Sequence, residues 1–233
     1  MNGSLFSWTR FFSSVPQILP YLAVTFKIVA AATIAGVLLG ILVALVRIYK
    51  TPVVYQICTV YISFMRGTPM LVQMFLILYG LPMLIDPIFG SNIGRTWDKI
   101  YFAYVTFILN QGAFLSSIFY SAIKSVPIGQ TEAGLSVGLT EFQNFTRIVL
   151  PQAVKTALPP FGTDFIGLFQ NVSLVATIGV LDIMGRAQAI GSATSHALEP
   201  YIFVALIYIV ISLLMRYAFA KADLKLSFGK RVR

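Results

Sequence analysis

The chain has 233 residues, of which 58% are hydrophobic and 11% charged, and its formal net charge is +9. Because an ordinary soluble domain is about one-quarter charged, this composition indicates one transmembrane domain over residues 1–233. The basic residues lie mostly between or after apolar runs, which favours a lipid bilayer over nucleic acid as their partner. With one cysteine, Cys58, and one histidine, His196, an internal disulfide is excluded and no metal site is expected. Cys58 is expected to serve as a small apolar residue.

Five apolar segments have about the length that a bilayer requires, which is about 20 residues for a helix. In chain order they are residues 28–46, extendable back to about residue 18, then 67–85, 100–123, 165–181 and 200–215. Helices are expected, because each backbone donor must be satisfied within its own segment. The predicted fold is an all-α membrane protein with about five transmembrane helices. Residues 51–65 lie either at the interface or in the lower part of a kinked second helix, and Pro69 begins or kinks that helix. Residues 86–98 form an external loop.

An odd number of spans puts the two termini on opposite sides. One side would hold twelve of the seventeen basic residues, namely Arg47, Lys50, Arg66, Lys124, Arg147, Lys155, Arg216, Lys221, Lys225, Lys230, Arg231 and Arg233. The positive-inside rule therefore predicts the N-terminus outside and the C-terminus in the cytoplasm.

A cytoplasmic loop at about residues 125–157 separates the third and fourth spans and has its own helix signals. Pro127 can open a helix, and Gly138 can end it in a left-handed conformation. Thr140 and Gln143 have capping-box spacing, so a second short helix should follow and stop at Pro151. Spacing alone leaves two interpretations open: a hairpin packed on its own bundle, or a docking element for a cytoplasmic partner.

The loop resembles the EAA loop of ABC importer permeases, which docks on the ATPase subunit in that family. The resemblance rests on Glu132, Ala133, Gly134, Gly138, Ile148, Leu150 and Pro151 at the family's spacings. Gly134 departs from the pattern, which usually has a second alanine there.

Other segments are similar to the polar amino acid branch of these permeases. They are Arg-Gly-Thr-Pro at 66–69 with the residues to 73, and the stretches 125–130, 150–153 and 159–162. Residues 132–140, 178–180 and 187–188 most resemble cystine and sulfur amino acid permeases. Relatives usually have Lys-Asp-Thr-Ser-Leu where residues 170–174 read Gln-Asn-Val-Ser-Leu, and many have Glu and Arg where this chain has Ser117 and Tyr120.

The resemblance implies a permease subunit of the bacterial inner membrane with several partners. These are two copies of an ATPase that carry ATP and magnesium, a second permease chain that is identical or paralogous, and an extracytoplasmic substrate-binding protein. The sequence has no Gly-rich phosphate loop, so neither ATP hydrolysis nor a cofactor is expected in this chain.

Polar residues inside spans are costly and are candidates for lining a substrate path. They are Asp164, Gln170, Asn171, Ser173 and Thr177 in the fourth span, Asn110 and Gln111 in the third, and Arg66 before the second. Asp164 either meets an α-amino group, lies in water at the cytoplasmic end, or pairs with Lys155. Arg66 either binds a carboxylate or extends to the interface.

Three other classes of function place different demands on the sequence. An intramembrane enzyme needs a nucleophile–base pair or a metal set, and the scattered acids supply neither. An ion-coupled secondary amino acid carrier remains the alternative, although it often shows an internal repeat that is not visible here. A silent scaffold would not need the spacings of the EAA-like loop.

Overall fold

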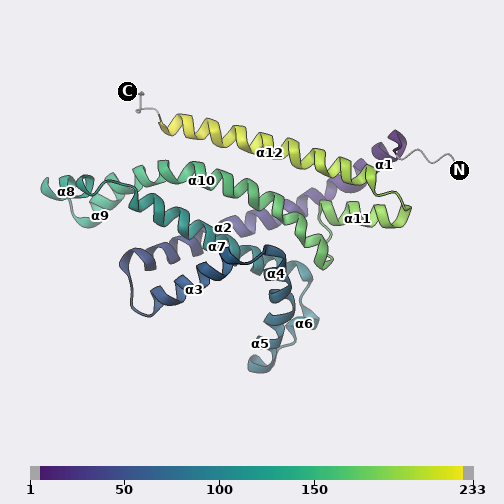
Figure 1. Ribbon diagram of the computed structural model, residues 1–233, viewed down its shortest axis with the longest axis horizontal. Coiled ribbons are helices and arrows are strands. Elements are labelled where there is room, and N and C mark those ends of the chain that lie inside the picture. Colours follow the sequence, from purple (N-terminus) through teal and green to yellow (C-terminus); the bar gives the residue numbers. More distant parts are fainter. Residues whose placement is uncertain (1–5, 228–233) are drawn as a thin grey trace.

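A computed structural model describes residues 6–227, and every regular element in that range is helical (Figure 1). The α-helices are joined in places by short 3-10 or π segments, which are labelled η. The bounds are α1 Trp8–Ile18, η1 Leu19–Tyr21, α2 Leu22–Tyr49, α3 Val54–Gly67, α4 Met70–Phe75, η2 Leu76–Gly80, α5 Leu81–Phe89, α6 Ile93–Thr96, α7 Lys99–Lys124, α8 Ile128–Ser136, α9 Glu141–Asn144, η3 Phe145–Val149, α10 Leu150–Asn171, η4 Val172–Ile178, α11 Ile183–Thr194 and α12 Leu198–Ser227.

Within the described residues, five helical stretches are long and apolar enough to cross a bilayer. They are Trp8–Tyr49, Met70–Phe89, Lys99–Lys124, Glu141–Ile178 and Leu198–Leu226. This finding confirms the all-α class and the five predicted spans. The basic residues Lys230, Arg231 and Arg233, which contributed to the predicted orientation, lie outside the described range.

The fourth stretch begins well before the predicted residue 165, because the helix does not stop at Pro151 as predicted. The π segment η3 ends at Val149, two residues before this proline, and the Leu150 N–H donates to the Phe145 carbonyl five residues back. A widened turn accommodates both the proline ring and its missing N–H. The helical path therefore runs without interruption from α9 into α10.

Helices α2 and α7 pack closely at the centre of the bundle. A Cβ added to Gly36 would lie 2.9 Å from the Gln111 Cβ, and one added to Gly40 would lie 2.9 Å from the Leu115 Cβ. Small residues at such positions let two helix backbones approach each other in a membrane. The adjoining core cluster, which includes Phe169 of α10, joins α2, α7 and α10.

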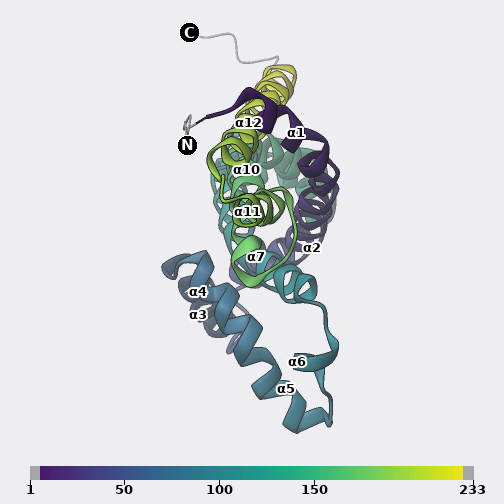
Figure 2. The same cartoon turned by 90° about the vertical axis from the view of Figure 1, so that its right-hand side faces the viewer.

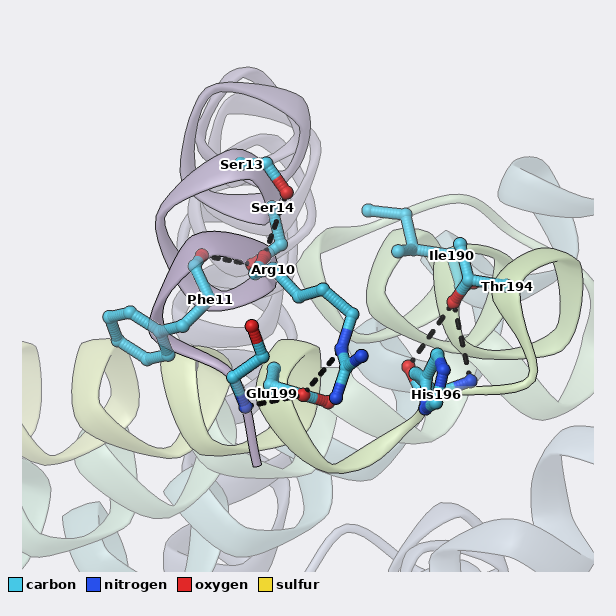
Figure 3. A network of polar contacts seen from close by, with 9 residues as sticks. Arg10, Phe11, Ser13, Ser14, Ile190, Thr194, His196 and Glu199 are labelled. Atoms are coloured by element: carbon cyan, nitrogen blue, oxygen red, sulfur yellow. Dashed lines mark hydrogen bonds and ion pairs between the residues drawn. The ribbon is translucent and has the colours of Figure 1, made fainter. Parts of the chain in front are cut away.

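An ion pair between a partly exposed arginine and a buried carboxylate attaches α1 to α12. Glu199 Oε1 accepts hydrogen bonds from Arg10 Nε at 2.8 Å and from the Ser7 N–H at 3.0 Å (Figure 3). Glu199 is 1% exposed, so removing Arg10 would take away a positive charge that stabilises this buried carboxylate. In the same view His196 contributes its backbone: its N–H and carbonyl both interact with the Thr194 hydroxyl.

Helices α3 to α6 project to one side of the bundle (Figure 2). Helix α3 is anchored to α2 and α7 by a cluster that includes Ile62, Met65 and the buried Cys58, which confirms the apolar role expected for this cysteine. Pro69 directly precedes the first residue of α4, so this proline begins a helix. Farther out, α5 exposes large apolar side chains such as Met83 and Phe89.

The two ends of the bundle carry different elements. Helices α8 and α9 lie at one end, and α1 and α11 lie at the other (Figure 1). Helix α7 connects the two ends and spans about 39 Å at 1.5 Å per residue. Its first and last residues, Lys99 and Lys124, therefore lie at opposite ends of the molecule.

Candidate functional site

The loop between α7 and α9 has the local structure that the sequence predicts. Pro127 is the N-cap of α8, and Gly138 has φ +84°, in the left-handed region where glycine carries no Cβ penalty. The Leu139 N–H donates to the Gly134 carbonyl at 3.2 Å, which closes the end of α8. Thr140 and Gln143 form the predicted capping box, with both reciprocal hydrogen bonds present.

Helix α8 packs on the following helix through Gly134. This glycine is buried, and a Cβ there would collide with Asn144 Oδ1 and lie 2.8 Å from Ile148 Cδ1. The Asn144 Nδ2 also donates to the Thr131 carbonyl at 2.8 Å. The departure from the usual second alanine therefore matches an intramolecular contact that has no room for a methyl group.

The residues next to Gly134 in the sequence face away from Asn144 and Ile148. Glu132 and Ala133 are exposed, as are Leu135 of the same helix and Val137, its C-cap. Leu150 and Pro151 are exposed on the first turn of α10. The structure thus divides the EAA-like residues into an inner set around Gly134 and Ile148 and an exposed set that includes Glu132 and Ala133.

A second candidate region lies where the helical path breaks between α3 and α4. Gln73 is 1% exposed and its Nε2 donates to the carbonyls of Met65 and Thr68, at 2.8 and 3.0 Å. Its Oε1 accepts from Asn110 Nδ2 at 2.8 Å. The side chain of Gln73 therefore satisfies carbonyls exposed by the break and connects them to α7. Gln73 was not among the predicted path residues, although an uncharged amide within the second apolar run was a usable signal.

A polar cavity of about 210 Å³ lies beside this break. It is formed between α4, α7 and α10, and its polar lining residues are Asn110, Gln111, Asp164 and Asn171. Gln111 Nε2 donates to Asp164 Oδ2 across the cavity. Within the described chain Asp164 forms no ion pair with Lys155, so one of the open interpretations of this carboxylate is set aside.

The remaining substrate-path candidates do not line this polar cavity. Gln170 Nε2 donates to Ser212 Oγ of α12 at 3.2 Å, and the hydroxyls of Ser173 and Thr177 donate to backbone carbonyls three residues back, those of Gln170 and Leu174. Helical geometry explains the division, because Asp164 and Asn171 are two turns apart on one face whereas Gln170 is rotated away from it.

Two arginines contact the neutral residues that replace Glu and Arg of many relatives. Arg66 Nη1 donates to Ser117 Oγ at 3.1 Å, and its guanidinium lies 5.5 Å from the centre of the Phe114 ring beside the polar cavity. The Arg47 guanidinium lies 4.2 Å from the centre of the Tyr120 ring. Residues 117 and 120 are thus contacts for cations from α3 and α2.

Among residues 6–227, His, Cys, Asp and Glu side chains form no group that could hold a metal ion. The polar side chains that line the polar cavity are three amides and one carboxylate. Such groups can bind a small polar solute by hydrogen bonds and charge, without covalent steps.

Comparisons with known proteins give a consistent result. The sequence pattern of the family described as "Binding-protein-dependent transport system inner membrane component" matches residues 36–227. The L-cystine transport system permease protein TcyL of Bacillus subtilis (strain 168) is 40% identical over 209 residues, which cover 90% of this chain and 87% of that protein. The arginine transport system permease protein ArtQ of the same organism is 34% identical, over 91% of this chain and 93% of that protein.

Solved structures show the same fold. A structure titled "Crystal structure of an amino acid ABC transporter with histidines" aligns with a TM-score of 0.82 and 29% identity, over 94% of this chain and 99% of that chain. An inward-facing structure of the MetNI methionine ABC transporter aligns with a TM-score of 0.68 and 18% identity, over 95% and 100% of the two chains.

Proposed function

Because the chain belongs to the family of binding-protein-dependent transport system inner membrane components, we propose that it forms an amino acid path and couples it to a separate ATPase. It is a multi-pass permease subunit of an amino acid ABC importer in the inner membrane, and ATP hydrolysis is performed by other subunits.

The observation that carries the proposal is one helical path that joins the two candidate regions. The stretch Glu141–Ile178 begins beside α8 and contributes Asp164 and Asn171 to the polar cavity. A displacement of α8 can therefore reach the cavity through a continuous helix.

We assign the docking contact to the exposed residues Glu132 and Ala133. Two ATPase copies bound to two permease chains would approach each other on binding ATP and draw the two α8 helices together. Gly134 transmits this movement, because it packs on Asn144 and Ile148 at the start of the long helical path. Gly138 holds the bend, and rigid-body rocking of the spans opens the path.

The second permease chain, identical or paralogous, is expected to cover part of the projecting helices α3 to α6. Met83, Leu84, Ile88 and Phe89 of α5 are each more than 60% exposed. An apolar surface of this kind is typical of a face that lipid or another chain covers.

The positive-inside rule places α8 and the C-terminus in the cytoplasm and the N-terminus outside. Arg47 and Lys50 end α2 on the same side as Lys124, which supports this placement. The extracytoplasmic binding protein would then approach the end that carries α1 and α11.

In the polar cavity Asp164 is the group suited to the α-amino group of the substrate. Its carboxylate already accepts a hydrogen bond from Gln111, and the amides of Asn110 and Asn171 lie in the same lining. A cationic ammonium would form a charge-assisted hydrogen bond with this carboxylate. The ordered amides would hold the rest of the polar backbone of the substrate.

L-Cystine is the substrate favoured by the similarity to TcyL and by the motif at residues 132–140. The 34% identity to ArtQ, an arginine permease, makes arginine the competing substrate.

The test is ATPase activity and uptake in vesicles that contain this chain, its ATPase and its binding protein. Cystine-loaded binding protein should stimulate ATP hydrolysis and uptake, and Glu132→Ala should abolish the stimulation. Glu141→Ala is the matched control, because Glu141 is also exposed nearby but lies outside the EAA-like residues. Stimulation by arginine alone would overturn the cystine assignment, and uptake driven by an ion gradient without ATPase would favour the secondary carrier.

A further inference from the structure

A large cavity lies at the end of the bundle opposite α8. Its volume is about 920 Å³, within the range typical of small-molecule sites. We call it the vestibule and define it by Phe75, Tyr79, Arg95, Lys99, Thr177 and Gln188, which come from α4, η2, α6, α7, η4 and α11. In the proposed orientation it faces the extracytoplasmic side.

The charged residues that line the vestibule are both cations, Arg95 and Lys99. Within residues 6–227 neither forms an ion pair. Asp86 and Asp98 do not line the vestibule: Asp86 Oδ1 accepts from the Ser91 hydroxyl and the Ile93 N–H, and Asp98 Oδ1 accepts from the Ile100 N–H. The vestibule therefore offers two positive charges to a ligand.

Lys99 has its backbone at the N-terminus of one helix and its ammonium group at the C-terminal end of another. It is the first residue of α7, where the helix dipole disfavours a positive charge. Its Nζ lies over Gly179, 3.1 Å from the point that a Cβ would occupy. Gly179 has φ +83°, so the turn after η4 favours glycine and leaves room for the ammonium group.

The vestibule and the polar cavity lie along the same helices. Both are lined by the path through α4 and η2, by α7, and by the path through α10 and η4. On α7, Lys99 and Gln111 are twelve residues apart, which corresponds to about 18 Å. The two cavities carry opposite charges, because the polar cavity is lined by one carboxylate, Asp164, whereas the vestibule is lined by two cations.

We propose that the vestibule binds the α-carboxylate of the amino acid after it leaves the binding protein and before its ammonium group reaches Asp164. This inference rests on the proposed function. The Lys99 ammonium and the Arg95 guanidinium supply charge-assisted hydrogen bonds to the carboxylate. Phe75, Tyr79 and Trp97 in the same lining give an apolar surface for the side chain of the substrate.

The test measures uptake in vesicles that contain the complete transporter, with the loaded binding protein at saturating concentration. Lys99→Met should lower uptake per ATP hydrolysed about tenfold, the loss expected for one charge-assisted hydrogen bond. Arg95→Gln tests the same charge from another element, and Lys99→Arg should restore uptake to within about twofold of the wild type. Lys27→Met is the matched control, because it removes an exposed cation of α2 that does not line the vestibule.

The affinity of the binding protein for the vesicles is measured for each variant and should stay unchanged. Uptake that is unaffected in both Lys99→Met and Arg95→Gln would overturn the inference. A loss confined to binding-protein affinity would also overturn it, because the cations would then serve a protein surface. A wild-type complex that hydrolyses ATP but transports no amino acid would overturn the proposed function itself.

Discussion

Replacing Gly134 by alanine tests how α8 is held against the start of the long helical path. A methyl group there would collide with Asn144 Oδ1 and lie 2.8 Å from Ile148 Cδ1. Overpacking of this kind costs about 1–3 kcal/mol. Alanine regains about 1 kcal/mol over glycine inside a helix, so the α8 contact should weaken by about 0–2 kcal/mol.

Hydrogen exchange of the α8 amides measures this local change directly. At the upper end of the range, protection of residues 130–136 should fall by up to about 30-fold, while the core amides of α7 stay protected. Uptake per ATP hydrolysed should fall in parallel, because a loosened α8 transmits less of its movement to Asn144 and Ile148.

Gly129→Ala is the matched control, since it lies in the same helix and an added Cβ would have no neighbour within 4 Å. A second change, Asn144→Ala, removes the colliding oxygen and should recover part of the protection lost in Gly134→Ala. Equal protection in the Gly134 and Gly129 variants would refute the packing role of Gly134.

Four further changes have defined outcomes. Gly138→Val puts a β-branched residue at φ +84°, which costs about 1–3 kcal/mol, so uptake should be lost while ATP hydrolysis persists; normal coupling would exclude a role for the bend. Asp164→Asn should reduce uptake at least about tenfold without disassembling the complex, as seen by size-exclusion chromatography. Gly40→Val should force α2 from α7, destabilise the chain by about 1–3 kcal/mol and lower its melting temperature; an unchanged melting temperature would contradict the close packing. Burial raises the pKa of Asp182 to about 6, above its unfolded value of about 3.9, so stability should fall by up to about 3 kcal/mol as the pH rises from about 4 to 6. Asp182→Asn, which keeps the helix cap, should remove this slope in melting curves taken against pH.

Features determined by a few neighbouring residues were predicted well from the sequence. The N-cap Pro127, the left-handed Gly138 and the Thr140–Gln143 capping box each depend on local backbone preferences, and all three are present. The five spans follow from composition and length alone.

Features that depend on tertiary packing were predicted less well. The expected stop at Pro151 was wrong, because a π segment that no simple periodicity predicts lies before it. Gln73 was missed because its function is to satisfy a break between two helices, which the sequence does not locate. The substrate-path candidates of the fourth span lie on different faces of the helix: Asp164 and Asn171 line the polar cavity, whereas Gln170 contacts α12.

The length of the uninterrupted stretch Glu141–Ile178 determines how far a small tilt at one end displaces the other end in the proposed transporter. Its 38 residues span about 57 Å at 1.5 Å per residue. A rod of that length tilted by about 5° about one end moves its other end by about 5 Å, close to one helical turn. A small rotation of the end beside the ATPase is thus enough to widen or close a passage of amino acid size at the opposite end of the stretch. Pro159 and Pro160 mark where the helix would bend if the segments on either side of them moved relative to each other.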